Sequence, residues 1–93
     1  MYDDVLVAMQ LCVQEGRAAL TNHAYDEMAE DGFFVFDLEQ CVYTGTIVER
    51  QWDEGFQDWK YVVYGKSADE ENLAVVVQMD RNQNIVFITT YLL

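Results

Sequence analysis

The sequence predicts an α+β fold in which two to three short N-terminal helices pack on a four-stranded antiparallel β-meander. The first half of the chain repeats apolar residues at helical spacing, separated by residues that favour helix ends. From Ile47 onward, runs of β-branched and aromatic residues alternate with short polar turns. These turns are too short to contain crossover helices, so neighbouring strands are expected to pair antiparallel.

The first predicted helix carries a single apolar stripe. Val5, Met9, Cys12 and Val13 fall at i, i+4, i+7 and i+8, which places them on one helical face. Gly16 is expected to end this helix, because glycine readily adopts the left-handed conformation found after many helices. Two more helices are predicted, at about residues 23–30 after a cap at Thr21 or Asn22, and at about residues 36–43 before Gly45.

The predicted strands are unusually apolar. They cover residues 47–52, 59–65, 73–79 and 85–91, and two of them lack the alternation of a strand with one wet face. Both faces of the sheet therefore require cover, and three short helices are enough for one face and part of the other. A homodimer is expected to cover the rest, and the alternative is an unusual arrangement of the helices. The apolar run at residues 33–36 supports a homodimer too, unless a buried connection between helices absorbs it.

The charge of the chain restricts its partners. Seventeen acidic residues against five basic ones give a formal net charge of −12 in 93 residues. Such a charge repels phosphate backbones and anionic membrane surfaces, so neither nucleic acid nor a membrane is an expected partner. A basic protein partner fits this charge, and the alternative is that the acids only keep the domain soluble.

The remaining composition indicates one domain over residues 1–93. No proline, repeat or low-complexity stretch marks a linker, and no apolar run is long enough to cross a bilayer. We therefore expect neither a signal peptide nor an anchor. Cys12 and Cys41 lack the spacing of a metal site, which favours two free thiols in a cytoplasmic protein, with a disulfide as the alternative.

Several short segments carry a family resemblance: His23-Ala24-Tyr25-Asp26-Glu27-Met28, Gly32, and residues 37–39, 45–49 and 88–91. Through them the chain, over about residues 20–92, resembles the small bacterial domain of unknown function numbered 4258. The resemblance implies a toxin-like (RelE-like) fold, similar to the small ribonuclease toxins of bacterial toxin–antitoxin pairs. Glu27 and Asp31 stand where that family carries arginine, and this reversal of charge counts against an RNA substrate.

His23 leads the candidate catalytic residues. It is the single histidine, and histidine is the side chain best suited to proton transfer near neutral pH. Together with Arg50 and Tyr91 it could stabilise an anion. The alternative is structural: His23 anchors a helix start, Arg50 pairs with a surface acid and Tyr91 packs at the sheet edge. Glu27, at i+4 from His23, would supply only a second metal ligand, so neither a metal nor a cofactor is expected.

Residues 52–59 form the candidate binding loop. Trp52, Phe56 and Trp59 alternate there with acids, a composition typical of a protein-binding rim, and Glu49 on the preceding strand is grouped with them. The alternative is that these rings pack back over the sheet. The sequence favours an uncharacterised, non-enzymatic protein-interaction domain of a toxin–antitoxin or regulatory system. The alternative function is a ribonuclease-type toxin, or a degenerate relative of one, that uses His23.

Overall fold

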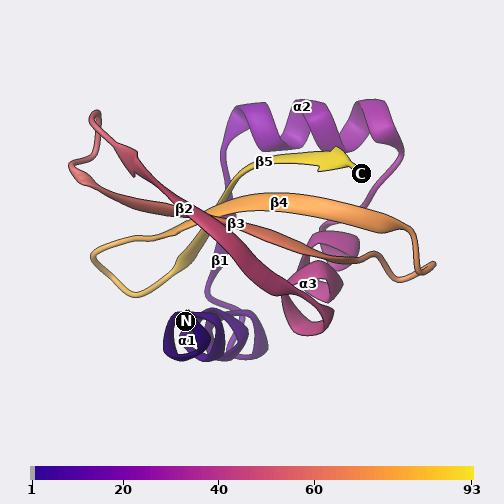
Figure 1. Ribbon diagram of the computed structural model, residues 1–93. Helices are drawn as coiled ribbons and strands as arrows, with labels where there is room; N and C mark the ends of the chain where they lie inside the picture. Colours follow the sequence, from indigo (N-terminus) through magenta and orange to yellow (C-terminus); the bar gives the residue numbers. More distant parts are fainter. Residues whose placement is uncertain (1) are drawn as a thin grey trace.

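The computed structural model describes residues 2–93, which form an α+β arrangement of three helices and five strands (Figure 1). The last two helices and the last four strands confirm the predicted ranges to within one residue at each end, and the first helix contains the predicted apolar stripe. The elements are α1 (Asp3–Gln14), β1 (Ala18–Leu20), α2 (Asn22–Asp31), α3 (Val35–Thr44), β2 (Thr46–Asp53), β3 (Asp58–Lys66), β4 (Asn72–Met79) and β5 (Ile85–Leu92).

The sheet is mixed and has the strand order β1-β5-β4-β3-β2, so the predicted four-stranded antiparallel meander was wrong. Strands β2 to β5 do pair antiparallel in sequence order, but β1 joins the far edge parallel to β5. The β1 strand has only three residues and no β-branched side chain, so its pattern carries no strand signal. It is held by its partner: Ile85 donates to the Arg17 carbonyl and Thr21 to the Phe87 carbonyl.

The helix ends follow local chemistry. The Thr21 hydroxyl caps α2 by accepting from the Ala24 N–H at 3.1 Å, which confirms one of the two predicted caps. Gly16 and Gly32 adopt the left-handed conformation, each with φ of 75°, directly after α1 and α2. Gly45 differs, because it is extended with φ of −99°. A Cβ at Gly45 would lie 2.5 Å from the Tyr64 carbonyl oxygen, so close packing requires glycine there.

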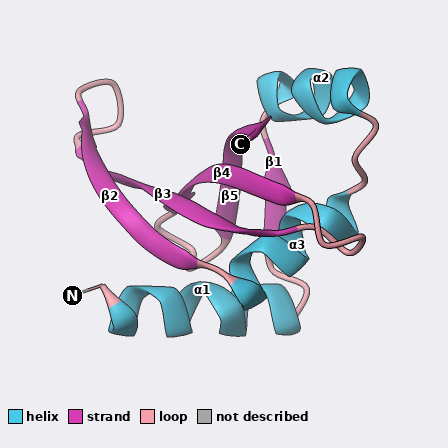
Figure 2. Ribbon diagram, turned by 45° about the vertical axis from the view of Figure 1, so that its right-hand side comes forward, coloured by secondary structure: helices cyan, strands magenta, loops and turns pink. Residues whose placement is uncertain are grey.

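The core lies between the sheet and the helices. Figures 1 and 2 show α1 and α3 together on one side of the sheet, with α2 running beside β5. Gln10 of α1 donates to the Val42 carbonyl of α3 at 3.2 Å, which joins these two helices. The side chains buried most completely in this core are Met9, Ala24, Leu38, Cys41, Val42, Val63, Leu73, Val75, Val77, Ile85 and Phe87.

The other face of the sheet has its own apolar row. Val62, Ala74 and Val76 are buried but lie apart from the core cluster, and their register places them on the opposite face. Tyr64 and Tyr91 flank Ala74 across the strands, and each is 40% exposed. The absence of alternation in β4 therefore reflects a strand buried on both faces.

Strand β2 forms a free edge of the sheet, because it pairs only with β3. Most of its side chains are exposed, and a bulge between Ile47 and Glu49 interrupts its ladder. Charges at Glu49 and Arg50 lie in its middle. Among residues 2–93, no helix combines the length and apolar character that crossing a membrane demands.

Candidate functional site

A groove lies at the end of the sheet where the β2–β3 and β4–β5 hairpins turn. Its volume is about 460 Å³. Residues 53–58 of the first hairpin form one wall, and residues 80–82 of the second form another. The floor comes from Gln78, Met79, Val86 and Ile88, and Thr21 closes the side next to α2. Segments more than sixty residues apart in the sequence therefore meet in one hollow.

Three aspartates at the rim are held in place by the backbone of their own turns. One oxygen of Asp53 accepts from the N–H groups of Gly55 at 3.0 Å and Phe56 at 3.4 Å. Asp58 accepts from the Trp59 N–H at 2.7 Å. Asp80 accepts from the turn that follows it, and the Asn84 backbone N–H is the main cause that lowers the pKa of Asp80. These bonds fix the carboxylates before any ligand arrives.

The rim concentrates negative charge. Asp53 and Asp58 stand directly opposite each other in the β2–β3 register. Like charges in that position repel, and the repulsion is relieved when a cation lies between them. Arg81 is the one basic residue in the lining, and within the described chain no ion pair joins it to an acid. The groove therefore favours positively charged groups.

The floor is apolar with one buried amide. Gln78 is only 8% exposed, and its Nε2 donates to the Trp59 carbonyl at 3.4 Å. Its Oε1 accepts no hydrogen bond from any described residue and is not enclosed by protein, so it is open to a donor from outside the chain. Phe56, on the wall above, is 76% exposed and extends the apolar surface to the rim. The groove thus combines apolar contact, fixed negative charge and a free acceptor.

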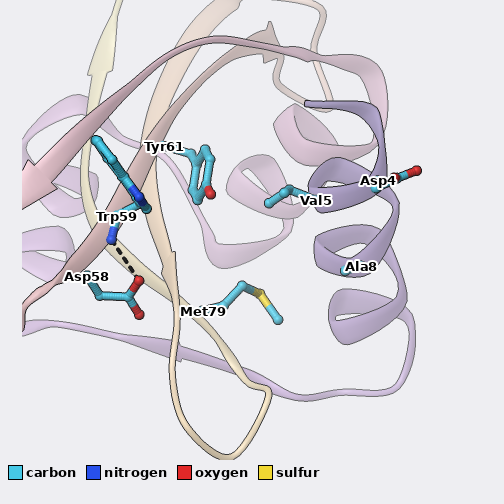
Figure 3. Close-up of a pocket in the computed structure, with 7 residues that line it drawn as sticks. All are labelled: Asp4, Val5, Ala8, Asp58, Trp59, Tyr61 and Met79. Atoms are coloured by element: carbon cyan, nitrogen blue, oxygen red, sulfur yellow. Dashed lines mark hydrogen bonds between the residues drawn. The ribbon is translucent and has the colours of Figure 1, made fainter. Parts of the chain in front are cut away.

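A second hollow, of about 330 Å³, lies between α1 and the sheet (Figure 3). Trp59, Tyr61 and Met79 face Val5 of α1 across it, while the carboxylate of Asp4 points away. Asp58 and Met79 also line the groove, so the two hollows are neighbours. This hollow is mostly apolar and offers fewer polar groups for recognition.

Arg50 is part of an aromatic cluster beside this second hollow. Its guanidinium carbon lies 3.9 Å from the Trp59 ring centroid and 5.8 Å from that of Tyr2. Trp52 meets Trp59 edge to face at 5.1 Å. Trp59 therefore contacts both residues, while Trp52 stays 44% exposed. Of the predicted binding loop, Phe56 alone extends freely into solvent, and the two tryptophans pack on each other.

The three predicted catalytic residues lie in different surroundings. His23 is on α2, with a side chain 64% exposed and Nε2 3.6 Å from a Glu27 oxygen. The strand register places Arg50 opposite Tyr61 on the face of the core, and Tyr91 on the other face. Burial raises the pKa of Tyr91, and its neighbours Tyr64 and Glu49 raise it further. Glu49 therefore faces the same side of the sheet as Tyr91, opposite to its neighbour Arg50, and the catalytic roles stay predictions.

Sequence reasoning missed Gln78, Asp80 and Val86 as groove residues. The one available signal was the pattern Asp80-x-Asn82-x-Asn84, which is typical of a tight turn with side-chain acceptors. Among residues 2–93, no group of three or more histidine, cysteine, aspartate or glutamate side chains is arranged to hold a metal ion. Cys12 and Cys41 are both free and buried.

Comparison with known proteins gives one match. A family model described as "Domain of unknown function (DUF4258)" matches residues 20–92. No curated protein and no solved structure matches the chain. Every residue that lines the groove lies inside the matched range, whereas Asp4, Val5 and Ala8 of the second hollow lie outside it. The groove is therefore the hollow that belongs wholly to the matched domain.

Proposed function

Since the chain belongs to the family described as Domain of unknown function (DUF4258), which carries no assigned activity, we propose from the groove that it is a protein-interaction domain. In this proposal the groove binds a basic segment of a partner protein. The observation that carries it is the pairing of an apolar floor with three fixed aspartates at the rim. An apolar pocket with a few placed polar groups is the usual form of a binding site.

The net charge of −12 supports the same proposal at longer range. A strongly acidic protein attracts basic partners and accelerates their encounter, and this attraction weakens as salt screens it. The free acceptor of Gln78 and the exposed ring of Phe56 supply short-range contacts that do not depend on salt. Binding is therefore expected to weaken with salt without being abolished.

The proposal is tested by titrating the isotopically labelled chain with a short peptide of alternating basic and leucine residues. Backbone amide shifts are expected at residues 53–58, 78–82 and 86–88, with an affinity that falls as salt rises. A peptide of the same length with glutamate in place of the basic residues is the control. The proposal fails if neither peptide moves these signals at millimolar concentration, or if the shifts lie elsewhere.

A homodimer belongs to the same proposal. It is supported by the exposure of Phe34 and Phe36, which are 74% and 50% exposed although both belong to the apolar run at residues 33–36. Light scattering at tens of micromolar is expected to give about twice the 10.8 kDa of one chain. A mass of one chain would contradict it. The RelE-like fold and a bacterial, cytoplasmic origin are further expectations from the family resemblance.

A ribonuclease-type toxin, or a degenerate relative that uses His23, is the weaker alternative. Arg50 is stacked on Trp59 and shares no face with Tyr91, so the three residues do not converge on one anion. Induced expression in a bacterial host, with wild type compared to His23→Ala, separates the two functions. Growth arrest that the folded variant relieves would favour the toxin, and normal growth with both would favour the binding domain.

A further inference from the structure

We propose that the groove selects an arginine side chain of the partner over a lysine. The inference rests on the proposed function, because it specifies which basic residue the groove accepts. It requires a site whose shape and hydrogen-bond acceptors distinguish a flat, forked cation from a compact one. Three features of the groove make that distinction.

The first feature is the opposed pair Asp53 and Asp58. Each uses one carboxylate oxygen to accept from the backbone of its own turn, and the second oxygen of each accepts no hydrogen bond within the described chain. Two free acceptors on facing strands match the forked donors of a guanidinium, which binds carboxylates through parallel N–H groups. A lysine ammonium is a point charge and gains less from two separated acceptors.

The second feature is the apolar surface between these acids and the sheet. Phe56 presents an exposed ring at the rim, and Val86 and Ile88 form the floor. A guanidinium is weakly hydrated and stacks on aromatic faces, whereas an ammonium loses more hydration on entering such a site. The same hairpin already shows this chemistry on its other face, where Arg50 stacks on Trp59 at 3.9 Å.

The third feature is the free Oε1 of Gln78. Gln78 lines the groove and its Nε2 donates to the Trp59 carbonyl, while its Oε1 has no donor among residues 2–93 and is not enclosed by protein. A bound arginine has five N–H donors, so it can satisfy Gln78 as well as the two aspartates. Lysine has three donors on one atom, so it offers fewer and less widely spaced donors to these acceptors.

Arg81 provides an independent test of whether the ligand of the groove is positively charged. It is the one cation in the lining and would repel an arriving arginine. Replacing it by glutamine, as Arg81→Gln, is therefore expected to tighten binding of the arginine peptide by roughly threefold at low salt. If the groove instead used Arg81 to recognise an acidic partner, the same change would weaken binding of the glutamate peptide.

The deciding experiment uses three labelled peptides that are identical except for a central arginine, lysine or citrulline. Fluorescence anisotropy with the full chain is expected to show arginine bound roughly tenfold more tightly than lysine and citrulline. The double change Asp53→Asn with Asp58→Asn is expected to remove this preference. Asp69→Asn with Glu70→Gln, which deletes the same two charges in the turn between β3 and β4, is expected to keep it.

The possible failures are distinguishable. Equal binding of arginine and lysine would overturn the arginine selectivity and leave the proposed function standing. No binding of either peptide by the folded wild type would overturn the proposed function itself. Circular dichroism checks that the double variant is folded, and if it is not, Phe56→Ala provides the same comparison through loss of the stacking surface.

Discussion

Asp53 and Asp58 lie directly opposite each other, so their negative charges repel and destabilise the folded chain. A role in binding a cation explains why two acids stand there. Asparagine keeps the acceptor that each turn uses, so Asp58→Asn removes the repulsion while preserving the hydrogen bond to Trp59. We expect this change to raise the free energy of unfolding by about 0.2–1 kcal/mol and to weaken peptide binding. Urea denaturation measures the first effect. A loss of stability would show that the carboxylate is needed for the fold.

Cys41 is chemically inert by position. Burial raises the pKa of its thiol to about 12, despite opposing hydrogen bonds from Gly65 and Val75, and its Sγ donates to the Leu73 carbonyl at 3.3 Å. Because the thiolate is the nucleophile, only roughly one Cys41 in 10,000 is reactive at about pH 8. Iodoacetamide is expected to leave Cys41 unmodified in the native chain and to alkylate it in urea, as mass spectrometry of the peptides would show.

The same pKa gives stability a pH dependence. The pKa of Cys41 is higher in the folded chain than in the unfolded chain. Its protonated thiol therefore contributes fully to the free energy of unfolding below about pH 9, and this contribution is lost as pH rises toward 12. Tyr91, whose pKa is also raised, acts in the same direction. The loss of stability between about pH 9 and 11 should be smaller in Cys41→Ala than in wild type. An equal loss in both chains would assign it to other groups.

The candidate site shows how far single residues can be read from a sequence. Phe56 was identifiable, because an exposed aromatic in an acidic turn is a local pattern. The packing of Trp52 and Arg50 on Trp59 was not, because it depends on a register that local composition does not encode. His23 lies beside Glu27 at i+4, as the spacing predicts, and its side chain is largely exposed.

At the scale of elements, α3 and β3 approach each other so closely that only glycine fits at the contact. A Cβ at Gly65 would overlap the carbonyl oxygen of Cys41 in α3. The nearest atoms all belong to the backbone, so they cannot move aside as the end of a flexible side chain could. Gly65→Ala is therefore expected to lower the free energy of unfolding by about 2 kcal/mol or more. Gly55→Ala, in the open β2–β3 turn, is the control and should cost far less. Similar losses in both variants would contradict the close approach.

Thr21 joins two elements through one hydroxyl. It accepts from the Ala24 N–H to cap α2 and donates to the Ile88 carbonyl at 2.8 Å, where β1 has ended and β5 continues. Thr21→Val keeps the shape but removes both bonds, so we expect a loss of about 1–2 kcal/mol in urea denaturation. Thr46→Val on the exposed edge strand is the matched control. Equal effects would argue against the joint role of Thr21.

Strand β1 explains why the predicted sheet was incomplete. The long strands carry their own signal in β-branched and aromatic residues, and so do the helices in their apolar stripes. Residues 18–20 carry none and become a strand only because β5 offers a free edge once the chain has folded. Pairing between segments that lie far apart is a tertiary effect, so it turned a predicted antiparallel meander into a mixed sheet.

At the scale of the whole molecule, the net charge of −12 dominates. Within residues 2–93 one ion pair occurs between permanently charged groups, Arg17 with Glu15, and His23 pairs with Glu27 only when protonated, so the acids are largely unpaired and repel one another. Raising sodium chloride from about 10 mM to about 0.2 M is expected to stabilise the fold, on the order of 1 kcal/mol, because this repulsion is screened. Urea midpoints at the two salt concentrations measure it. A fall in stability would mean that attractive pairs outweigh repulsion.

The free edge at β2 discriminates between identical and foreign chains. If two copies met there antiparallel across a twofold axis through the middle of the strand, Glu49 would oppose Glu49 or Arg50 would oppose Arg50. A strand from another protein is not bound by that symmetry and can set an opposite charge against each. The edge thus resists the edge-to-edge pairing by which identical chains extend their sheets into fibres, but it can still pair with a strand of a different protein.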